Sequence, residues 1–228
     1  MFSRETVLFL IVAVGAVLQA MFIAAEHREK YIAADILKGA ASLMFVLLGY
    51  IAYHTVNNVF NRQFFMGLLF GMIGDILLNL RFVFEKSGQK IFLAGILAFL
   101  LGHVIYLLAL IPQARYGWFW PCVAIGAAAA ALLLAYIFRT MEVKTAFKIF
   151  GVFYLGAVFI MTAIALGIAF FVPSRRSVLY AVGAVLFTAS DVVLIFNTFS
   201  GVSKFSRRII NLTLYYAGQM LIACSLFF

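Results

Sequence analysis

The stretch QFFMGLLFGMIGDILLNL, residues 63–80, holds one charged side chain, Asp75. A run of this length and apolarity can cross a bilayer as an α-helix. The chain contains eight such runs, separated by short polar connections: 6–25, 32–53, 63–80, 91–111, 119–138, 149–172, 177–198 and 209–227. The runs are continuously apolar rather than alternating, which favours helices over a β-barrel. The sequence therefore predicts an all-α, polytopic membrane protein, with one domain of eight transmembrane helices over residues 1–228.

The composition indicates the same fold class. Hydrophobic residues make up 66% of the 228 residues, charged residues make up 11%, and the mean hydropathy is +1.13. Soluble domains average roughly 45–50% apolar and about 25% charged residues. The two cysteines, Cys122 and Cys224, both fall inside predicted spans, so neither a disulfide framework nor a zinc site is expected.

The net charge of +9 reflects 17 Lys and Arg residues, which lie mainly in the connections, so no nucleic-acid partner is expected. These residues instead predict the topology, because cytoplasmic connections are enriched in Lys and Arg. The connections after odd-numbered spans hold most of them, including Arg28, Lys86 and Arg139. Both termini are therefore predicted to be non-cytoplasmic. For a compact chain of this kind we expect a bacterial inner membrane.

Asp75 and Asp191 are the two acidic residues predicted to lie inside spans. The other six lie at span ends or in connections, where water can solvate them: Glu5, Glu26, Glu29, Asp35, Glu85 and Glu142. An ionised carboxylate within a span costs up to ~2.5–3.5 kcal/mol on insertion scales. A bound proton, a hydrogen-bonding neighbour or a water-filled cavity must offset that cost. A structural hydrogen bond between helices is the simpler explanation, but two acids at matching depth favour a shared site.

The two acids also share their sequence context. Asp75 lies in GDILLN and Asp191 in SDVVLIFN. His103 follows Asp75 by 28 residues (103 − 75), Gln219 follows Asp191 by 28 (219 − 191), and a glycine precedes each of them. A parallel repeat of four plus four helices would explain this spacing.

Further polar side chains are candidates for the same site. His103 and Tyr106 are three residues apart, and Tyr215 and Gln219 are four apart, so each pair shares a helix face. Tyr216 adjoins the second pair. Competing explanations are core packing for the histidine and interfacial anchoring for the tyrosines.

The remaining candidates lie near the predicted cytoplasmic ends of the spans. Lys38 either snorkels to lipid phosphates or binds an anionic head group. Asn79 and Asn197 lie at helix ends, where capping explains an asparagine. They are also candidates for supporting the catalytic residues or binding the substrate. Three arginines are expected to attract a phosphate group: Arg81, Arg207 and Arg208. His27 and His54 lie on opposite sides of the membrane from each other, so a three-histidine metal site and other metal cofactors are not expected.

Two carboxyl groups in an apolar pocket suit acid–base chemistry, since one can donate a proton while the other activates water. At head-group depth the natural substrate is a lipid. The ordered set KGAASL (38–43), GDILLNL (74–80), GHVIYLL (102–108), SDVVL (190–194) and YYAGQMLIACSL (215–226) resembles the YhhN family of membrane proteins, which includes lysoplasmalogenases. The family usually has Lys-Pro where this chain has Lys38 and Gly39.

The resemblance implies hydrolysis of the vinyl ether bond of a lysoplasmalogen, which gives a fatty aldehyde and glycerophospho-ethanolamine or -choline. It implies a lysophospholipid as partner and no cofactor. We expect Asp75 and Asp191 to be the catalytic pair, with His103, Tyr106, Tyr216 and Gln219 orienting them and the attacking water. The residues alone do not assign the acid and the base.

Two other functions fit two membrane acids. An intramembrane aspartyl protease needs Gly-x-Gly-Asp, whereas this chain has two residues between Gly71 and Gly74, and it has no Pro-Ala-Leu segment. A proton-coupled carrier would use the acids as relays, but no Gly/Pro pair interrupts matching spans.

Overall fold

The computed structural model describes residues 3–114 and 116–228, and these residues form eight α-helices and no strand. Two short 3-10 turns, η1 (Glu85–Ser87) and η2 (Ile111–Gln113), flank α4. The helices are α1 (Arg4–His27), α2 (Tyr31–Thr55), α3 (Val59–Leu80), α4 (Gly88–Leu110), α5 (Tyr116–Thr140), α6 (Thr145–Phe171), α7 (Arg175–Phe199) and α8 (Phe205–Ser225). Each corresponds to one predicted run, which confirms the all-α class.

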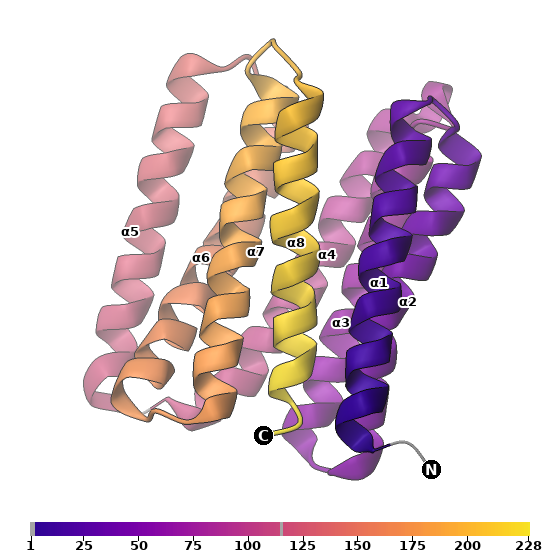
Figure 1. The fold of residues 1–228 in the computed structure, drawn as a ribbon. Helices are drawn as coiled ribbons and strands as arrows, with labels where there is room; N and C mark the ends of the chain where they lie inside the picture. The colour runs from indigo at the N-terminus through magenta and orange to yellow at the C-terminus, as the bar shows by residue number, and fades with distance from the viewer. Residues whose placement is uncertain (1–2, 115) are drawn as a thin grey trace.

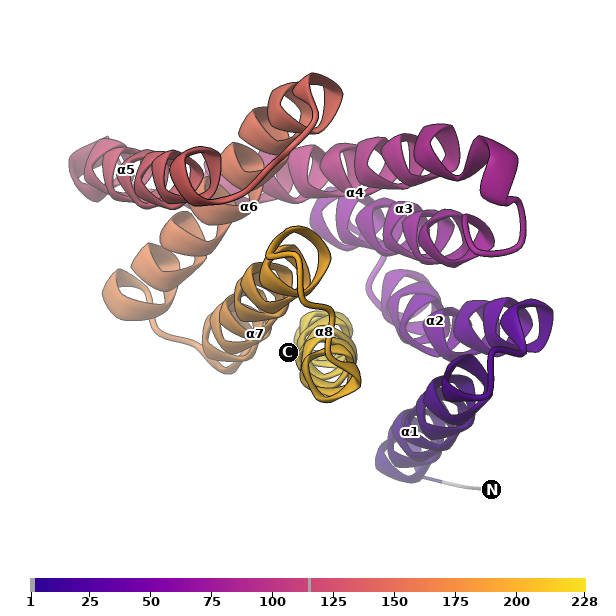
Figure 2. The ribbon, with the colours of Figure 1, turned by 90° about the horizontal axis from the view of Figure 1, so that it is seen from above.

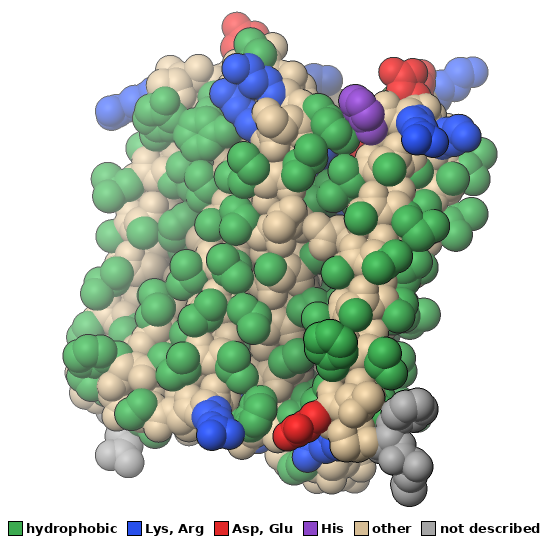
Figure 3. Space-filling model, viewed as in Figure 1, with side chains coloured by type: hydrophobic (Ala, Val, Ile, Leu, Met, Phe, Trp, Pro, Cys, Tyr) green, Lys and Arg blue, Asp and Glu red, His purple; other side chains and the backbone are tan. Residues whose placement is uncertain are grey.

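Seven of the described helices, α1 to α7, are long and apolar enough to cross a membrane. The chain is therefore a multi-pass membrane protein. The helix α8 covers the eighth predicted run but is more polar, because it carries Arg207, Arg208, Asn211 and Gln219. On the face seen in Figure 3, hydrophobic side chains cover the middle of the molecule and charged side chains gather at its two ends.

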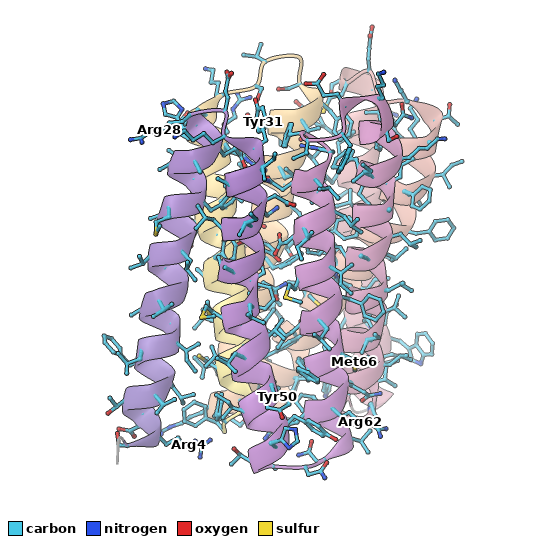
Figure 4. The ribbon with its side chains drawn as sticks, turned by 90° about the vertical axis from the view of Figure 1, so that its right-hand side faces the viewer. Arg4, Arg28, Tyr31, Tyr50, Arg62 and Met66 are labelled. Carbon is cyan, nitrogen blue, oxygen red and sulfur yellow. The ribbon has the colours of Figure 1, made fainter. Side chains whose placement is uncertain are left out.

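Successive helices run in opposite directions, so both termini lie at the same end of the bundle (Figure 1). At that end the Arg4 guanidinium donates a hydrogen bond to the Phe227 carbonyl oxygen at 3.2 Å. Arg28 and Tyr31 lie at the opposite end from Arg4 and Arg62 (Figure 4). The view from above places α8 beside α7 and facing α2, and α8 contacts both helices (Figure 2).

Close glycine contacts hold together the two helix pairs that carry the acids. A methyl group added at Gly102 of α4 would lie 3.0 Å from the Gly67 carbonyl oxygen of α3. One added at Gly218 of α8 would lie 2.8 Å from the Gly183 carbonyl oxygen of α7. Small residues let the backbones approach this closely. Gly67 and Gly183 each precede an intramembrane aspartate by eight residues (75 − 67 and 191 − 183).

The two halves of the chain have matching helix positions. A shift of 116 residues (191 − 75) carries Asp75 onto Asp191, and it carries the Gly67 and Gly102 pair onto Gly183 and Gly218. The same shift carries the N-cap of α3, Asn58, onto the N-cap of α7, Ser174. Both caps accept a hydrogen bond from the backbone N–H three residues later.

Candidate active site

Asp75 and Asp191 line a single cavity of about 100 Å³. A cavity of this size has room for water. The wall is otherwise largely apolar and includes side chains from α4, α6 and α7: Phe92, Ile96, Phe99, Phe147, Leu155, Phe187 and Ile195. The fold thus places both buried acids on one small chamber.

Asp75 of α3 is surrounded by donors. Its Oδ1 lies 3.2 Å from the Lys38 ammonium of α2. Its Oδ2 accepts hydrogen bonds from the Ser42 hydroxyl at 2.6 Å and from the Tyr215 hydroxyl at 2.5 Å. A buried carboxylate is tolerated when a cation and hydrogen-bond donors compensate its charge. The surroundings of Asp75 therefore suit the ionised form.

Asp191 of α7 has a much poorer set of partners. The Tyr154 hydroxyl of α6 donates to its Oδ2 at 2.6 Å. Within the described residues no Lys or Arg nitrogen lies within 4.0 Å of this carboxyl group. The side chain is buried and lines the cavity, whose wall is largely apolar. Burial without a cation favours the neutral acid.

Lys38 points inward. Only 2% of this residue is exposed, and its ammonium contacts Asp75 instead of reaching lipid phosphates at the membrane surface. The helix α2 runs unbroken past Lys38 and Gly39, so the glycine in place of proline does not interrupt it. The shift of 116 residues carries Lys38 onto Tyr154, the residue that contacts the other acid.

The polar residues of α8 form a layer behind Asp75. Tyr215 contacts the carboxylate directly, and the Gln219 amide donates to the Tyr215 hydroxyl at 3.4 Å. The Tyr216 hydroxyl lies 3.1 Å from Ser42 Oγ and donates to the Lys38 carbonyl oxygen at 3.3 Å. Both tyrosines are buried, so they are not interfacial anchors.

His103 and Tyr106 are buried, but neither lines the cavity nor bonds to either carboxyl group. The His103 Nδ1 atom lies 2.7 Å from the Phe99 carbonyl oxygen, within the same helix. The His103 ring packs edge-on against Tyr154, with centroids 5.7 Å apart. It also packs against Phe187, at 4.5 Å between centroids, so His103 contacts two side chains that line the cavity.

Asn79 and Asn197 are not lining residues of this cavity either. With its amide oriented to satisfy both neighbours, Asn79 donates to Glu26 Oε2 at 3.1 Å and accepts from the Asp35 backbone N–H at 3.3 Å. It therefore links α1, α2 and α3. The Asn197 side-chain oxygen accepts from the Lys204 backbone N–H at 2.8 Å, which closes the turn between α7 and α8.

The three predicted phosphate-attracting arginines have different surroundings. Arg208 makes a two-pronged ion pair with Glu26, at 2.7 and 3.0 Å, so Glu26 is not left to water as expected. Arg81 stacks over the rings of Phe82 and Phe92. Arg207 bonds to Ser200 and to the Val202 carbonyl oxygen in the connection before α8.

A model of the YhhN family matches residues 34–226. The chain belongs to the YhhN family. No curated protein and no solved structure matches it. The matched segment of this YhhN protein contains both aspartates and the four side chains that, among the described residues, make hydrogen bonds or an ion pair with them: Lys38, Ser42, Tyr154 and Tyr215.

Two of these contacts in the YhhN protein were missed by sequence reasoning. Ser42 lies four residues after Lys38 and so shares its helix face, which was the available signal. Tyr154 could be found in the sequence only by comparing the two halves of the chain along their length, since a shift of 116 residues carries Lys38 onto it. Among the described residues no group of three His, Cys, Asp or Glu side chains could hold a metal ion.

Proposed function

We propose that this YhhN protein is a lysoplasmalogenase, which hydrolyses the vinyl ether bond of a lysoplasmalogen to a fatty aldehyde and glycerophospho-ethanolamine or -choline. One observation carries the proposal: two buried carboxyl groups with unlike surroundings share one cavity. General acid–base catalysis by such a pair requires one protonated and one ionised group at the same pH. Family membership is consistent with this activity.

We infer the two roles from the unlike surroundings of the carboxyl groups. Asp191, in its neutral form, donates a proton to the β-carbon of the vinyl ether, and the double-bond electrons form the new C–H bond. This leaves an oxocarbenium ion at the α-carbon. The Asp75 carboxylate accepts a proton from water as the water oxygen bonds to the α-carbon, giving a hemiacetal. Collapse of the hemiacetal breaks the carbon–oxygen bond and releases the aldehyde and the glycerol hydroxyl, and proton transfer between the two acids restores the starting state.

The neighbouring side chains have supporting roles in this mechanism. Lys38 and the Ser42 and Tyr215 hydroxyls hold Asp75 as a carboxylate. The Tyr154 hydroxyl fixes the orientation of Asp191 by bonding to one oxygen, so that the other is left for the substrate. The apolar wall limits the water that can reach the cation.

We also propose that the chain crosses the membrane eight times. The helix α8 has 21 residues, which at ~1.5 Å each spans about 31 Å, enough for an eighth crossing. The 116-residue correspondence supports a parallel repeat of four plus four helices within one domain. The basic residues of the connections favour non-cytoplasmic termini, and we propose a bacterial inner membrane as the location.

Replacing each acid by asparagine tests the function. We expect Asp75→Asn and Asp191→Asn each to lower aldehyde release from a lysoplasmalogen by about 10²–10⁴-fold, the usual contribution of general acid–base catalysis. Asp35→Asn is the matched control, because Asp35 lies outside the cavity. Products of the purified protein are identified by mass spectrometry.

Three results would contradict the proposal. Normal turnover by either variant excludes that carboxyl group. Free fatty acid in place of aldehyde indicates a different hydrolase. Uptake of unchanged substrate into sealed vesicles, without hydrolysis, favours a carrier.

A further inference from the structure

A second cavity, of about 370 Å³, lies at the end of the bundle opposite the termini. It is lined by the end of α1, the ends of α3 and α7, and the start of α8: Glu26, Arg81, Phe82, Leu194, Asn197, Thr198, Ser203, Phe205 and Arg208. Leu194, Thr198 and Arg208 also line the cavity that holds the two acids. The two cavities are therefore neighbours that share a wall.

The charges on this second cavity do not balance. Arg208 is paired with Glu26, at 2.7 Å from Nε to Oε1. Arg81 has no carboxylate within 4.0 Å among the described residues, and stacking on Phe82 and Phe92 holds its guanidinium in place. Two arginines and one glutamate leave one positive charge unmatched. Guanidinium groups are well suited to binding phosphate oxygens.

The cavity also offers neutral donors. Asn197 uses its side-chain oxygen on the Lys204 N–H, which leaves its amide N–H groups available. The hydroxyl groups of Thr198 and Ser203 lie on the same wall. The Glu26 oxygens are occupied by Arg208 and Asn79. The lining therefore presents donors to a ligand rather than acceptors, as an anion requires.

The two cavities are close enough for the long side chains that line them to contact one molecule. Arg81 follows Asp75 by six residues on or just beyond α3, a rise of about 9 Å, and Thr198 follows Asp191 by seven on α7, a rise of about 10.5 Å. The α-carbon of a vinyl ether at one end of glycerol is separated from phosphorus at the other end by six bonds, an extended distance of roughly 7 Å. A phosphate held beside Arg81 therefore leaves the vinyl ether near the two acids.

We propose that this second cavity binds the phosphodiester of the lysolipid head group through Arg81 and Arg208, and that Glu26 limits it to a singly charged phosphate. The inference rests on the proposed function. A phosphodiester carries one negative charge and matches the unmatched positive charge, whereas a phosphomonoester carries about −1.5 to −2 at pH 7. Glu26 repels the additional charge. Arg207 lies in the first turn of α8 and lines neither cavity, because its guanidinium turns back to Ser200 and the Val202 carbonyl oxygen.

Three substrates with the same alkenyl chain on glycerol test this site: the neutral alkenylglycerol, its phosphomonoester and its phosphoethanolamine diester. Aldehyde release by the purified protein gives kcat/KM for each. We expect the wild type to prefer the diester. Arg81→Gln should lower the ratio of diester to neutral kcat/KM by at least about tenfold, the loss expected for a charge-assisted hydrogen bond. Arg207→Gln, which removes the same charge from the same end of the bundle, should leave that ratio within twofold of the wild type.

Glu26→Gln should raise the ratio of monoester to diester kcat/KM severalfold, because the cavity then carries two unmatched positive charges. Since this change also weakens a contact between α1 and α8, Arg81→Gln provides the test that leaves the Glu26–Arg208 pair intact. An unchanged ratio in Arg81→Gln overturns the inference. So does inhibition of alkenylglycerol hydrolysis by inorganic phosphate as strong as that by glycerophosphoethanolamine, which would identify a site for free phosphate. If the wild type releases aldehyde from none of the three substrates, the proposed function itself fails.

Discussion

Replacing Lys38 by methionine should destabilise the protein through the charge that remains on Asp75. The two groups lie 3.2 Å apart, and each side chain is 3% exposed. Removing one partner of a buried ion pair costs about 3–5 kcal/mol, because the other charge is left without compensation. The Ser42 and Tyr215 hydroxyls continue to solvate Asp75, so we expect the lower end of that range, about 3 kcal/mol.

The double variant Lys38→Met with Asp75→Asn isolates the electrostatic part. Asparagine accepts the same two hydroxyl donors without a net charge, so we expect it to lose only about 1 kcal/mol relative to the wild type. The double variant should then be about 2 kcal/mol more stable than Lys38→Met alone, roughly a thirtyfold difference in the unfolding equilibrium. Denaturation in mixed detergent micelles, followed by tryptophan fluorescence, measures both. A double variant less stable than Lys38→Met would refute a charged pair at this site.

Two further predictions concern α6. Tyr154→Phe keeps the ring and removes the donor to Asp191, so we expect kcat to fall about tenfold or more with little change in KM; a change confined to KM would contradict the orienting role. A methyl group added at Gly151 meets nothing within 4 Å, and this residue lines the cavity. Gly151→Leu should therefore fold with at least wild-type thermal stability, since glycine is a poor helix former, and should lower aldehyde release because its side chain takes up room in the small cavity. Gly156→Leu is the control, because Gly156 has the same open surroundings outside the cavity, and equal activity of the two leucine variants would exclude this cavity as the place of reaction.

The helices were predictable because a membrane span needs a long uninterrupted apolar run, and the charged connections mark where each run ends. The positions of the two acids along their helices could also be predicted from the sequence. The sequence did not predict which way each side chain points around its helix. In a membrane bundle, residues that face lipid and residues that face protein are both apolar, so hydropathy does not fix the rotation of a helix.

Lys38 and His103 illustrate that limit. At the depth of Lys38, a long side chain can either reach the membrane surface or turn inward, and the rotation of α2 places it against Asp75. His103 shares a face with Tyr106, as its spacing indicated, but that face packs against α3 and the Tyr154 ring instead of the cavity. Glu26 lies at a helix end where water was expected to solvate it, and only the position of α8 beside α1 reveals its pairing with Arg208.

The difference between the two acids can be traced to three positions. Asp75 receives its contacts from Lys38, Ser42 and Tyr215. A shift of 116 residues matches these three positions with Tyr154, Val158 and Phe99, of which Tyr154 bonds to Asp191 and Phe99 lines the same cavity. One neutral hydroxyl therefore replaces the ammonium group, and two apolar side chains replace the two hydroxyl donors.

Two identical half-chains would surround both carboxyl groups alike, and neither would be committed to donating or accepting the proton. In this chain the three corresponding positions differ, whereas close glycine contacts are present in both helix pairs, Gly67 with Gly102 and Gly183 with Gly218. In the proposed mechanism, Asp75 is the base because a cation and two hydroxyl donors surround it, and Asp191 is the acid because one hydroxyl donor contacts it. The two aspartates are chemically the same. The side chains that contact them therefore determine which one is the acid and which one is the base.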